Sequence, residues 1–289
     1  MLDFEIVDTH LHLWDPANLR YPWLDSVPYL NRPFLLPDYR QACGAIAVER
    51  MVFLQCECLV AQYRQEVEWV TTLAQIDPRI QGIVAWAPLE KGEAVEEELA
   101  ALARNPLVKG IRRIIQFEDD PEFCLRPDFI RGVRLLPRFG FCFDICVADY
   151  QMPAAVRFVE QCPEVSFVLD HIGKPCIREG LIEPWKSALR ALSEFPNVHC
   201  KVSSLATEAD HRTWTPAQLR PYVDHVFECF GFERTFFGGD WPVSAQAATY
   251  PQCVSTLLEL VQGAGPAQRR KLFRDNAITF YNLRDITSS

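Results

Sequence analysis

The sequence predicts an α/β fold in which a single (β/α)8 barrel (TIM barrel) carries a long loop after its first strand. Eight short runs of β-branched, aromatic and other apolar residues recur along the 289-residue chain, separated by stretches with helical periodicity. The runs repeat at intervals of roughly 25–35 residues, which suits one strand and one helix each. Eight strand–helix units favour a closed barrel over an open sheet.

The strand-like runs are continuously apolar, which is typical of strands buried on both faces of a parallel sheet. A sheet with one face in water would instead alternate apolar and polar residues. We expect the strands, in chain order, at residues 4–13, 50–57, 80–89, 108–115, 140–147, 165–173, 198–205 and 234–241.

The stretches between these runs place apolar residues on one face of a helix. In AQYRQEVEWVTTLAQI, residues 61–76, the positions that share a face are Tyr63, Val67, Val70 and Leu73. Further stretches with this pattern cover residues 93–105, 152–162, 184–195 and 216–230. The first turn of a helix tolerates proline, and the last three stretches begin near Pro153, Pro184 and Pro216.

The segment between the first two strands, residues 15–48, is long and rich in proline and aromatic residues. We interpret it as an excursion over the mouth of the barrel with little regular structure. Because loops tune selectivity on a rigid scaffold, we expect specificity determinants at Tyr21, Trp23 and Tyr29. No linker, low-complexity segment or second domain is evident, so we expect one domain over residues 1–289.

Composition limits the partners and the compartment. A formal net charge of −9 disfavours binding to a nucleic-acid backbone. The N-terminus lacks the basic and apolar regions of a secretory signal, and no apolar run reaches the roughly 18 residues of a membrane span. The 11 cysteines include no CxxC pair and are interpreted as free thiols, with a nucleophilic cysteine as the alternative. We expect a cytoplasmic protein without nucleic-acid or membrane partners, and its oligomeric state stays open.

Polar residues that end the strand-like runs are the candidates for chemistry, because catalytic groups in such barrels lie at the carboxyl ends of the strands. The first run ends in DTHLH, and the alternation of side chains along a strand places His10 and His12 on one face. Two imidazoles on one face can bind a metal ion or a substrate. A hydrogen-bonded pair near the surface is the alternative.

The sixth run ends in DHIGKP, residues 170–175, and the eighth in FGGDWP, residues 237–242. His171 either faces the pocket from a strand-to-loop turn or is satisfied within the core. The two glycines before Asp240 permit close approach of a backbone or a ligand. Asp240 then emerges where the imidazoles converge, with the capping of a following helix as its alternative role.

The remaining runs offer further candidates. One arginine of the pair at 112–113 should face inward and the other outward. Arg112 is the one that we expect to face the pocket, where a guanidinium suits a carbonyl or carboxylate group, and an outward salt bridge is its alternative. Arg113 is a further candidate substrate contact, and Lys201 either contacts the substrate or pairs with a carboxylate inside the barrel. The other candidate substrate contacts are Gln55, Trp86, Asp144, Trp241 and Trp23, and Trp14 is a candidate for an apolar wall.

HxH on the first strand, His on the sixth and Asp on the eighth together resemble the amidohydrolase superfamily. More specifically, the chain is similar to L-fuconolactonase- and L-rhamnonolactonase-like proteins of the amidohydrolase-2 type. The motifs that carry this likeness, in order over nearly the whole chain, are DTHLHLWDP, YPWL, GIRR, LDHIGKP, CKVSSLATEA, GGDWPV and DNAITFYNL. The resemblance implies hydrolysis of a sugar lactone to the open aldonic acid.

The resemblance also implies roles for single residues. It makes Arg112 a substrate contact, and the pocket residues that it implies are His10, His12, His171 and Asp240. Metal-dependent relatives commonly have a carboxylated lysine on strand 4 or a histidine on strand 5, whereas this chain has RR at 112–113 and DIC at 144–146. We therefore expect one divalent ion, Zn²⁺ first, on the pocket residues rather than a two-metal centre. Some lactonases of this superfamily work without metal, so turnover without an ion stays open.

In such a reaction Asp240 is the natural general base for water, and later the acid that returns the proton. Arg112 and the imidazoles, His171 included, or a metal ion polarise the carbonyl group. Two alternatives remain. The first is hydrolysis or decarboxylation of a polycarboxylate such as a pyrone or muconolactone, which several cationic groups would favour. The second is a non-catalytic sugar-binding barrel.

Overall fold

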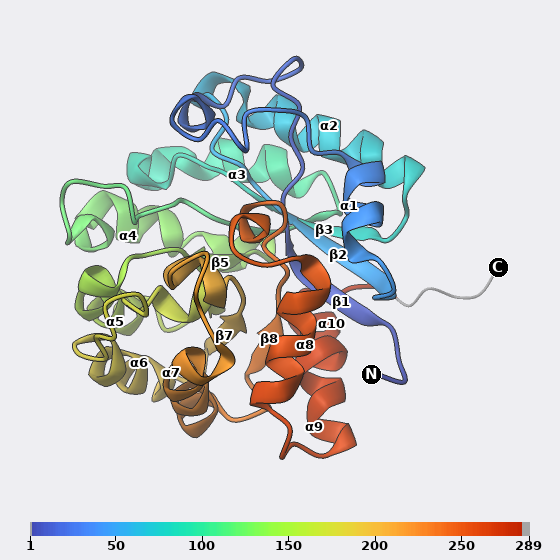
Figure 1. The fold of residues 1–289 in the computed structure, drawn as a ribbon. Coiled ribbons are helices and arrows are strands. Elements are labelled where there is room, and N and C mark those ends of the chain that lie inside the picture. Colours follow the sequence, from blue (N-terminus) through green and yellow to red (C-terminus); the bar gives the residue numbers. More distant parts are fainter. Residues whose placement is uncertain (1, 285–289) are drawn as a thin grey trace.

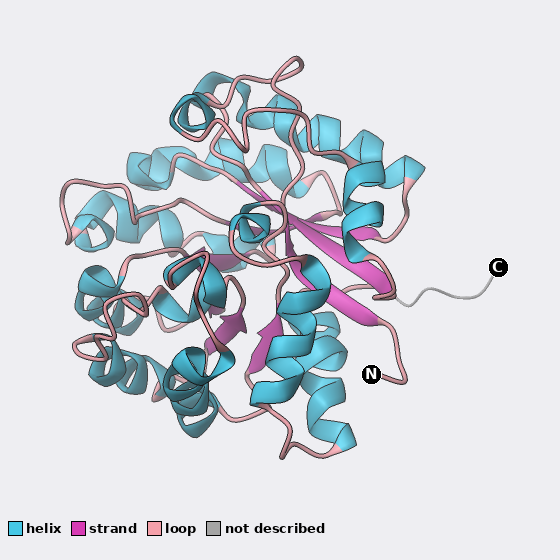
Figure 2. Ribbon diagram, viewed as in Figure 1, coloured by secondary structure: helices cyan, strands magenta, loops and turns pink. Residues whose placement is uncertain are grey.

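The computed structural model describes residues 2–284 of the chain. Eight parallel strands pair in chain order with helices around them, which confirms the predicted barrel (Figures 1 and 2). The strands are β1 (Ile6–Leu11), β2 (Val48–Leu54), β3 (Ile80–Ala85), β4 (Val108–Ile111), β5 (Cys142–Ile145), β6 (Phe167–Leu169), β7 (Val198–Val202) and β8 (Thr235–Phe237).

Every predicted strand overlaps an observed one, but the observed strands end earlier. The sixth run predicts a strand over residues 165–173, whereas β6 spans only Phe167–Leu169. The backbone of His171 and Ile172 has positive φ angles of 52° and 50°, and a strand cannot continue through such a conformation. The polar ends of the predicted runs therefore belong to loops at the mouth of the barrel.

The helices follow the strands and cover the outside of the barrel. They are α1 (Leu36–Cys43), α2 (Tyr63–Ile76), α3 (Glu96–Ala103), α4 (Pro127–Val133), α5 (Met152–Glu160), α6 (Trp185–Ser193), α7 (Pro216–Phe230), α8 (Tyr250–Leu260), α9 (Pro266–Arg270) and α10 (Asn276–Phe280). The C-terminal helices α8 and α10 lie beside α1 and β1, so elements from the beginning and the end of the sequence pack side by side (Figure 1). Among residues 2–284, no helix has the length and apolar character needed to cross a membrane.

The prediction of little regular structure over residues 15–48 is wrong at the end of that segment, where α1 forms. The side chain of Asp38 accepts a hydrogen bond from the Leu35 amide at 2.9 Å, and Pro37 occupies the first turn. These residues are standard features of a helix start. The irregular excursion therefore ends before α1, and the Trp14–Phe34 bridge ties it to the barrel.

The barrel closes between the ends of β1 and β8 through a short backbone contact. The Asp240 amide donates to the His10 carbonyl at 2.7 Å, and the His12 amide donates to the Trp241 carbonyl at 2.8 Å. The Thr9 hydroxyl adds a bond to the Phe237 carbonyl at 2.6 Å. The residues that complete the sheet are therefore neighbours of the candidate site.

A buried carboxylate, Asp8, holds this closure from behind. Its Oδ1 accepts from the amides of Gly239 at 2.7 Å and His10 at 3.0 Å. Its Oδ2 accepts from the hydroxyls of Tyr39 on α1 at 2.7 Å and Tyr250 on α8 at 3.0 Å. Full burial raises the pKa of Asp8, although these four bonds oppose the shift. One side chain thus joins β1, the β8 loop and two helices.

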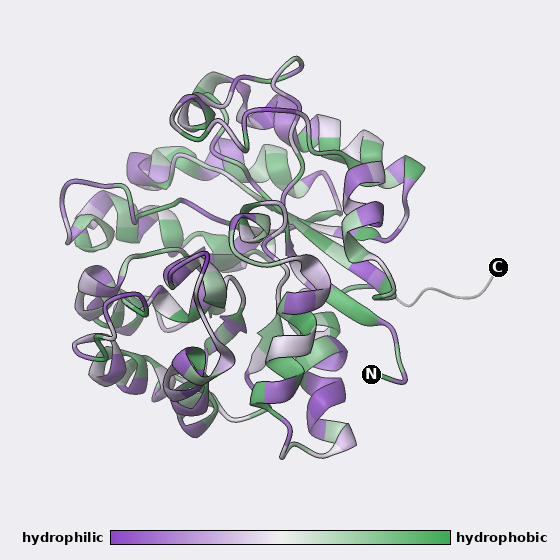
Figure 3. Cartoon of the chain, in the orientation of Figure 1, coloured by the Kyte–Doolittle hydropathy of each residue, from purple (hydrophilic) through white to green (hydrophobic). Residues whose placement is uncertain are grey.

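Two apolar clusters fill the molecule. The larger lies between the strands and the helices, and hydrophilic residues gather on the outer faces of the helices (Figure 3). The smaller gathers strand residues such as Val52, Val168 and Phe236 with Tyr281 and Leu283 from the C-terminal end. Since the Tyr281 hydroxyl lies 3.1 Å from the Asp144 carboxylate of β5, this end of the chain reaches into the barrel.

Gly239→Ala should destabilise the closure. A Cβ atom at Gly239 would lie 2.4 Å from the Tyr250 ring and 2.6 Å from Asp8 Oδ2. Overpacking of this kind costs about 1–3 kcal/mol of unfolding free energy. Gly263→Ala is the matched control, because its added methyl would meet nothing within 4 Å. Denaturant titration measures the unfolding free energy of both variants. Equal stability of the two would contradict the close packing of Gly239 against Asp8 and Tyr250 at the closure.

Candidate active site

A cavity of about 580 Å³, open to solvent, lies at the carboxyl ends of the strands. Its walls come from the loops after β1, β2, β4, β5, β6 and β8. The lining residues are His12, Trp14, Trp23, Cys56, Glu57, Arg112, Ile114, Gln116, Phe117, Cys146, His171, Lys174, Asp240 and Val243.

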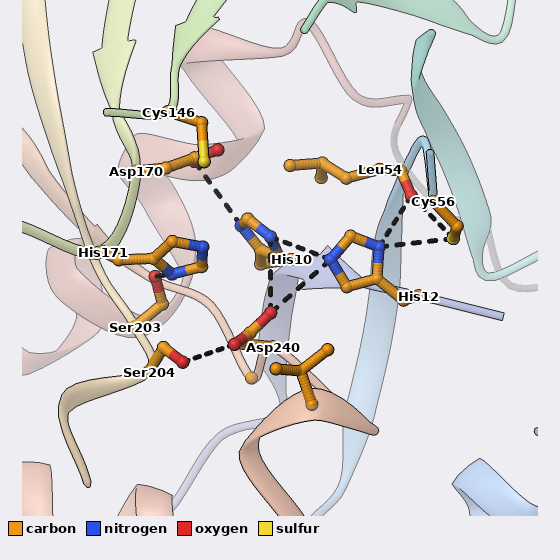
Figure 4. Close-up of polar contacts among 12 residues, drawn as sticks. His10, His12, Leu54, Cys56, Cys146, Asp170, His171, Ser203, Ser204 and Asp240 are labelled. Carbon is orange, nitrogen blue, oxygen red and sulfur yellow. Dashed lines mark hydrogen bonds and ion pairs between the residues drawn. The ribbon is translucent and has the colours of Figure 1, made fainter. Parts of the chain in front are cut away.

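His10, His12 and Asp240 form a compact triangle at this cavity (Figure 4). The Nε2 atoms of the two histidines are 3.1 Å apart, and each lies 3.5 Å from Asp240 Oδ1. All three residues are buried. The predicted histidine pair and the predicted aspartate are thus in direct contact.

Hydrogen-bond donors and acceptors fix the protonation of this triangle. His12 Nδ1 lies 2.8 Å from the Leu54 carbonyl, which can only accept, so Nδ1 carries the hydrogen. Arg112 Nη1 lies 3.1 Å from His10 Nε2 and can only donate, so this Nε2 accepts. In neutral imidazoles both Nε2 atoms therefore carry lone pairs, and both lie beside the Asp240 carboxylate. Such a set of acceptors favours a positive partner, which Arg112 supplies on the side of His10.

The triangle has the dimensions of a zinc site. Ligand bonds of 2.0–2.2 Å in tetrahedral geometry place the ligand atoms about 3.3–3.6 Å apart. The two separations of 3.5 Å fall in this range and the separation of 3.1 Å lies just below it, so the three atoms are close to one face of such a tetrahedron. The hydrogen bond from His12 to Leu54 is the support that ligating histidines usually have. These side chains fit a divalent cation.

Asp240 is held as an ionised carboxylate. Burial alone would raise its pKa, but His171, His12 and the Ser204 hydroxyl lower it to about 2. Ser204 donates a short hydrogen bond to Oδ2, which leaves Oδ1 facing the imidazoles (Figure 4).

The third predicted histidine, His171, packs beside His10 with ring centroids 4.4 Å apart. Its Nδ1 contacts the Ser203 hydroxyl at 2.9 Å, so the opposite nitrogen faces the cluster (Figure 4). Burial lowers the pKa of both His10 and His171 well below its ordinary value.

A buried charge network lies under the triangle. Lys201 Nζ contacts Asp144 at 2.8 Å and Asp170 at 2.9 Å, and all three side chains are fully buried. Burial would lower the pKa of Lys201, but the two carboxylates raise it. Asp170 in turn lies 3.4 Å from both Arg112 Nη1 and His10 Nδ1. Asp144 and Lys201, expected as substrate contacts, thus pair with each other beneath the cavity.

Of the other residues predicted to contact the substrate, one lines the cavity and four do not. Trp23 lines the cavity and donates its indole hydrogen to the Cys56 carbonyl at 2.8 Å. Gln55, Trp86, Arg113 and Trp241 are not lining residues. Gln55 bonds Glu57, Trp86 packs on Tyr63, Arg113 pairs with Glu118, and Trp241 packs on Phe34 and Tyr39. In the long loop, Tyr21 is buried against Trp14, whereas Tyr29 is exposed.

Two charged lining residues had no assigned role in the sequence analysis. Lys174 is partly buried and pairs with Glu208 at 3.5 Å; burial lowers its pKa, but Cys146, Glu208 and Asp240 outweigh this and raise it. Glu57 lies three residues beyond the end of β2. The signal for Lys174 was the motif DHIGKP, in which it follows His171 closely. Glu57 left no signal, because QCEC around it matches no motif.

Backbone strain is concentrated at this site. Seven non-glycine residues in the described part of the chain, residues 2–284, have positive φ, and Glu57, His171, Lys174 and Asp240 among them line the cavity. A non-glycine residue in this conformation costs of order 1–3 kcal/mol, and such strain clusters at functional sites. The mouth of the barrel therefore has a conformation that the surrounding core must enforce.

Comparison with known proteins agrees with this geometry. A family model described as amidohydrolase matches residues 7–283. The chain is 31% identical to L-fucono-1,5-lactonase of Burkholderia multivorans, with 96% of both chains covered. It is 26% identical to L-rhamnono-gamma-lactonase of Scheffersomyces stipitis, with 98% of this chain and 100% of the relative covered. A solved amidohydrolase from B. multivorans with bound zinc is 30% identical, with a TM-score of 0.87 over 97% of this chain and 100% of its own.

Glu66 on α2 gives the site a testable pH dependence. Its carboxyl group accepts from the Cys56 amide at 3.1 Å, and burial raises its pKa from 4.5 to about 8. The stability associated with this proton is complete below pH 4.5 and is lost as the pH rises through about 8. Relative to Glu66→Gln, the wild type should lose as much as about 1.4 kcal/mol per pH unit in this window.

Urea unfolding of both proteins between pH 4 and 9 measures the difference. Glu68→Gln on the exposed face of the same helix is the control and should show no such trend. A difference between wild type and Glu66→Gln that stays constant with pH would mean that Glu66 has an ordinary pKa.

Proposed function

The chain belongs to the amidohydrolase family, and from this premise we propose that it is a lactonase that opens a sugar lactone to the free aldonic acid. The observation that carries the proposal is the carboxylate of Asp240 facing the imidazoles of His10 and His12 in an open cavity. The relatives at 31% and 26% identity that bear lactonase names support the same reaction.

The charges at the cavity favour a neutral substrate over a polycarboxylate. Two cations line it, and both have carboxylate partners, with Arg112 on Asp170 at 3.4 Å and Lys174 on Glu208 at 3.5 Å. Glu57 adds a negative charge to the wall. A substrate with several carboxylates would need more positive charge than these two shared groups supply. The indole rings of Trp14 and Trp23 instead offer an apolar surface to a sugar ring.

In the proposed reaction Asp240 removes a proton from water as the water oxygen attacks the ester carbonyl carbon. Arg112 and Lys174 stabilise the negative charge that develops on the carbonyl oxygen. The ring C–O bond then breaks, and Asp240 returns the proton to the departing ring oxygen. Ser204 holds the second oxygen of Asp240, so the catalytic oxygen keeps its orientation.

A carboxylate whose pKa is about 2 is a weak base for water. We propose that one divalent ion, Zn²⁺ first, is held by His10, His12 and Asp240 at the triangle of lone pairs. When bound, such an ion acidifies water and polarises a carbonyl group. His171, with its free nitrogen toward the cluster, is placed to contact the ion or the substrate.

Asp240→Asn should reduce kcat/KM on a sugar lactone by about 10²–10⁴-fold, because the amide cannot accept the proton. The fold should persist, since the backbone bond to His10 is kept. Asp224→Asn on the exposed face of α7 is the matched control. Hydrolysis of L-fucono-1,5-lactone and related lactones, followed as acid release beside circular dichroism, checks this. A folded and fully active Asp240→Asn enzyme would remove the base from the mechanism.

Metal binding is tested apart from activity. Equilibrium dialysis with elemental analysis should find one Zn²⁺ per wild-type chain and a loss of affinity of more than about 100-fold in His12→Ala. His211→Ala, at an exposed histidine, should bind as the wild type does. Retention of zinc by His12→Ala, or no binding by the wild type, would show that the triangle is not the cation site.

A further inference from the structure

We infer that Glu57 selects a hydroxyl-bearing substrate by accepting hydrogen bonds from the hydroxyl groups of the lactone ring. This inference rests on the proposed function and adds a specificity residue to it. Glu57 lines the cavity three residues beyond the end of β2 and has a φ angle of 52°. A positive φ angle is energetically unfavourable for glutamate, whereas glycine or asparagine adopts it more readily.

The turn that carries Glu57 is held from several sides. Arg112 Nη2 donates to the Gln55 carbonyl at 2.6 Å. The Cys56 amide donates to the buried Glu66 at 3.1 Å, and the Cys56 carbonyl accepts from Trp23 at 2.8 Å. These bonds come from β4, α2 and the long first loop. Three separate elements therefore enforce one strained conformation, which is the pattern expected where a side chain must be placed.

The side chain of Glu57 is itself oriented by Gln55. Gln55 Nε2 donates to Glu57 Oε1 at 2.7 Å, while the Glu57 amide donates back to Gln55 Oε1 at 2.6 Å. This reciprocal pair fixes the carboxylate and occupies one of its two oxygens. Gln55, predicted as a substrate contact, thus acts as the residue that positions Glu57.

The second oxygen of Glu57 is left for a ligand. Among residues 2–284, Oε2 has no hydrogen-bond donor and the carboxylate forms no ion pair. The two cations of the cavity are engaged with Asp170 and Glu208. An ionised carboxylate is an acceptor only, so the groups that satisfy it are O–H or N–H donors. On a neutral sugar lactone these donors are the ring hydroxyl groups, and a ligand carboxylate at the same place would be repelled.

Glu57→Gln tests this role with little change of shape. The glutamine oxygen can still accept from Gln55, which turns the amide nitrogen toward the cavity and replaces an acceptor by a donor. Among a panel that begins with L-fucono-1,5-lactone, the sugar lactone that the wild type opens fastest serves as substrate. Its KM should rise about 10–100-fold in Glu57→Gln, because hydrogen bonds to charged groups are the strong ones.

δ-Valerolactone, which has the ring ester but no hydroxyl group, provides the comparison. Measured as a competitive inhibitor, it reports affinity whether or not it is opened, and its Ki should change by less than about twofold in Glu57→Gln. Glu118→Gln, at a glutamate that does not line the cavity, should change neither constant. Glu57→Asp is the second variant, because aspartate accepts positive φ more readily. It keeps the charge one methylene further back, so its KM should lie between those of wild type and Glu57→Gln.

The outcomes separate the two proposals. If the wild type opens no lactone of the panel, the proposed function fails. If the wild type is active and Glu57→Gln weakens both ligands equally, Glu57 has only a structural role and the inference is wrong. Unchanged constants in both Glu57 variants would also overturn it.

Discussion

Two backbone hydrogen bonds between the ends of β1 and β8 close the barrel and assemble the site at the same time. The Asp240 amide binds the His10 carbonyl, and the His12 amide binds the Trp241 carbonyl. The residues that form these bonds include all three residues of the triangle. Closing the sheet therefore brings the Asp240 carboxylate next to both imidazoles. Asp8 binds the amides of His10 and Gly239 and is itself fully buried, so it anchors this closure in the interior of the protein. Stability of the fold and placement of the candidate catalytic groups therefore rest on the same contact.

The charges below the cavity explain why this contact calls for a cation. Arg112 and Lys201 balance Asp170 and Asp144, and Lys174 balances Glu208. Asp240 remains as an additional negative charge next to two lone pairs. A buried charge without an opposite charge is costly in free energy. A bound cation, or a proton taken from a reacting water, would lower this cost at Asp240. The strained backbone around the mouth fits the same account, because a rigid core can pay for local strain where side chains must be fixed.

The barrel could be predicted from the sequence because eight continuously apolar runs have few other solutions. His10, His12, His171 and Asp240 could be placed because they stand at the carboxyl ends of such runs. The helix at Leu36–Cys43 was missed, since the proline-rich sequence before it masks its start. Strand ends were overestimated because positive φ angles at His171 and Asp240 leave no mark in composition. Glu57 could not be found, because its role depends on contacts with Gln55, Cys56 and their distant partners.

The most direct test of this account is a crystal structure of the protein with an aldonate product bound. The carboxylate carbon of the product should lie against Asp240 and Arg112, and its hydroxyl groups should reach Glu57 Oε2. Because the product carries the atoms of the opened ester, its position reports where the reaction takes place. An aldonate bound away from the β1–β8 closure, or one whose carboxylate points out of the cavity, would contradict the assignment of this site.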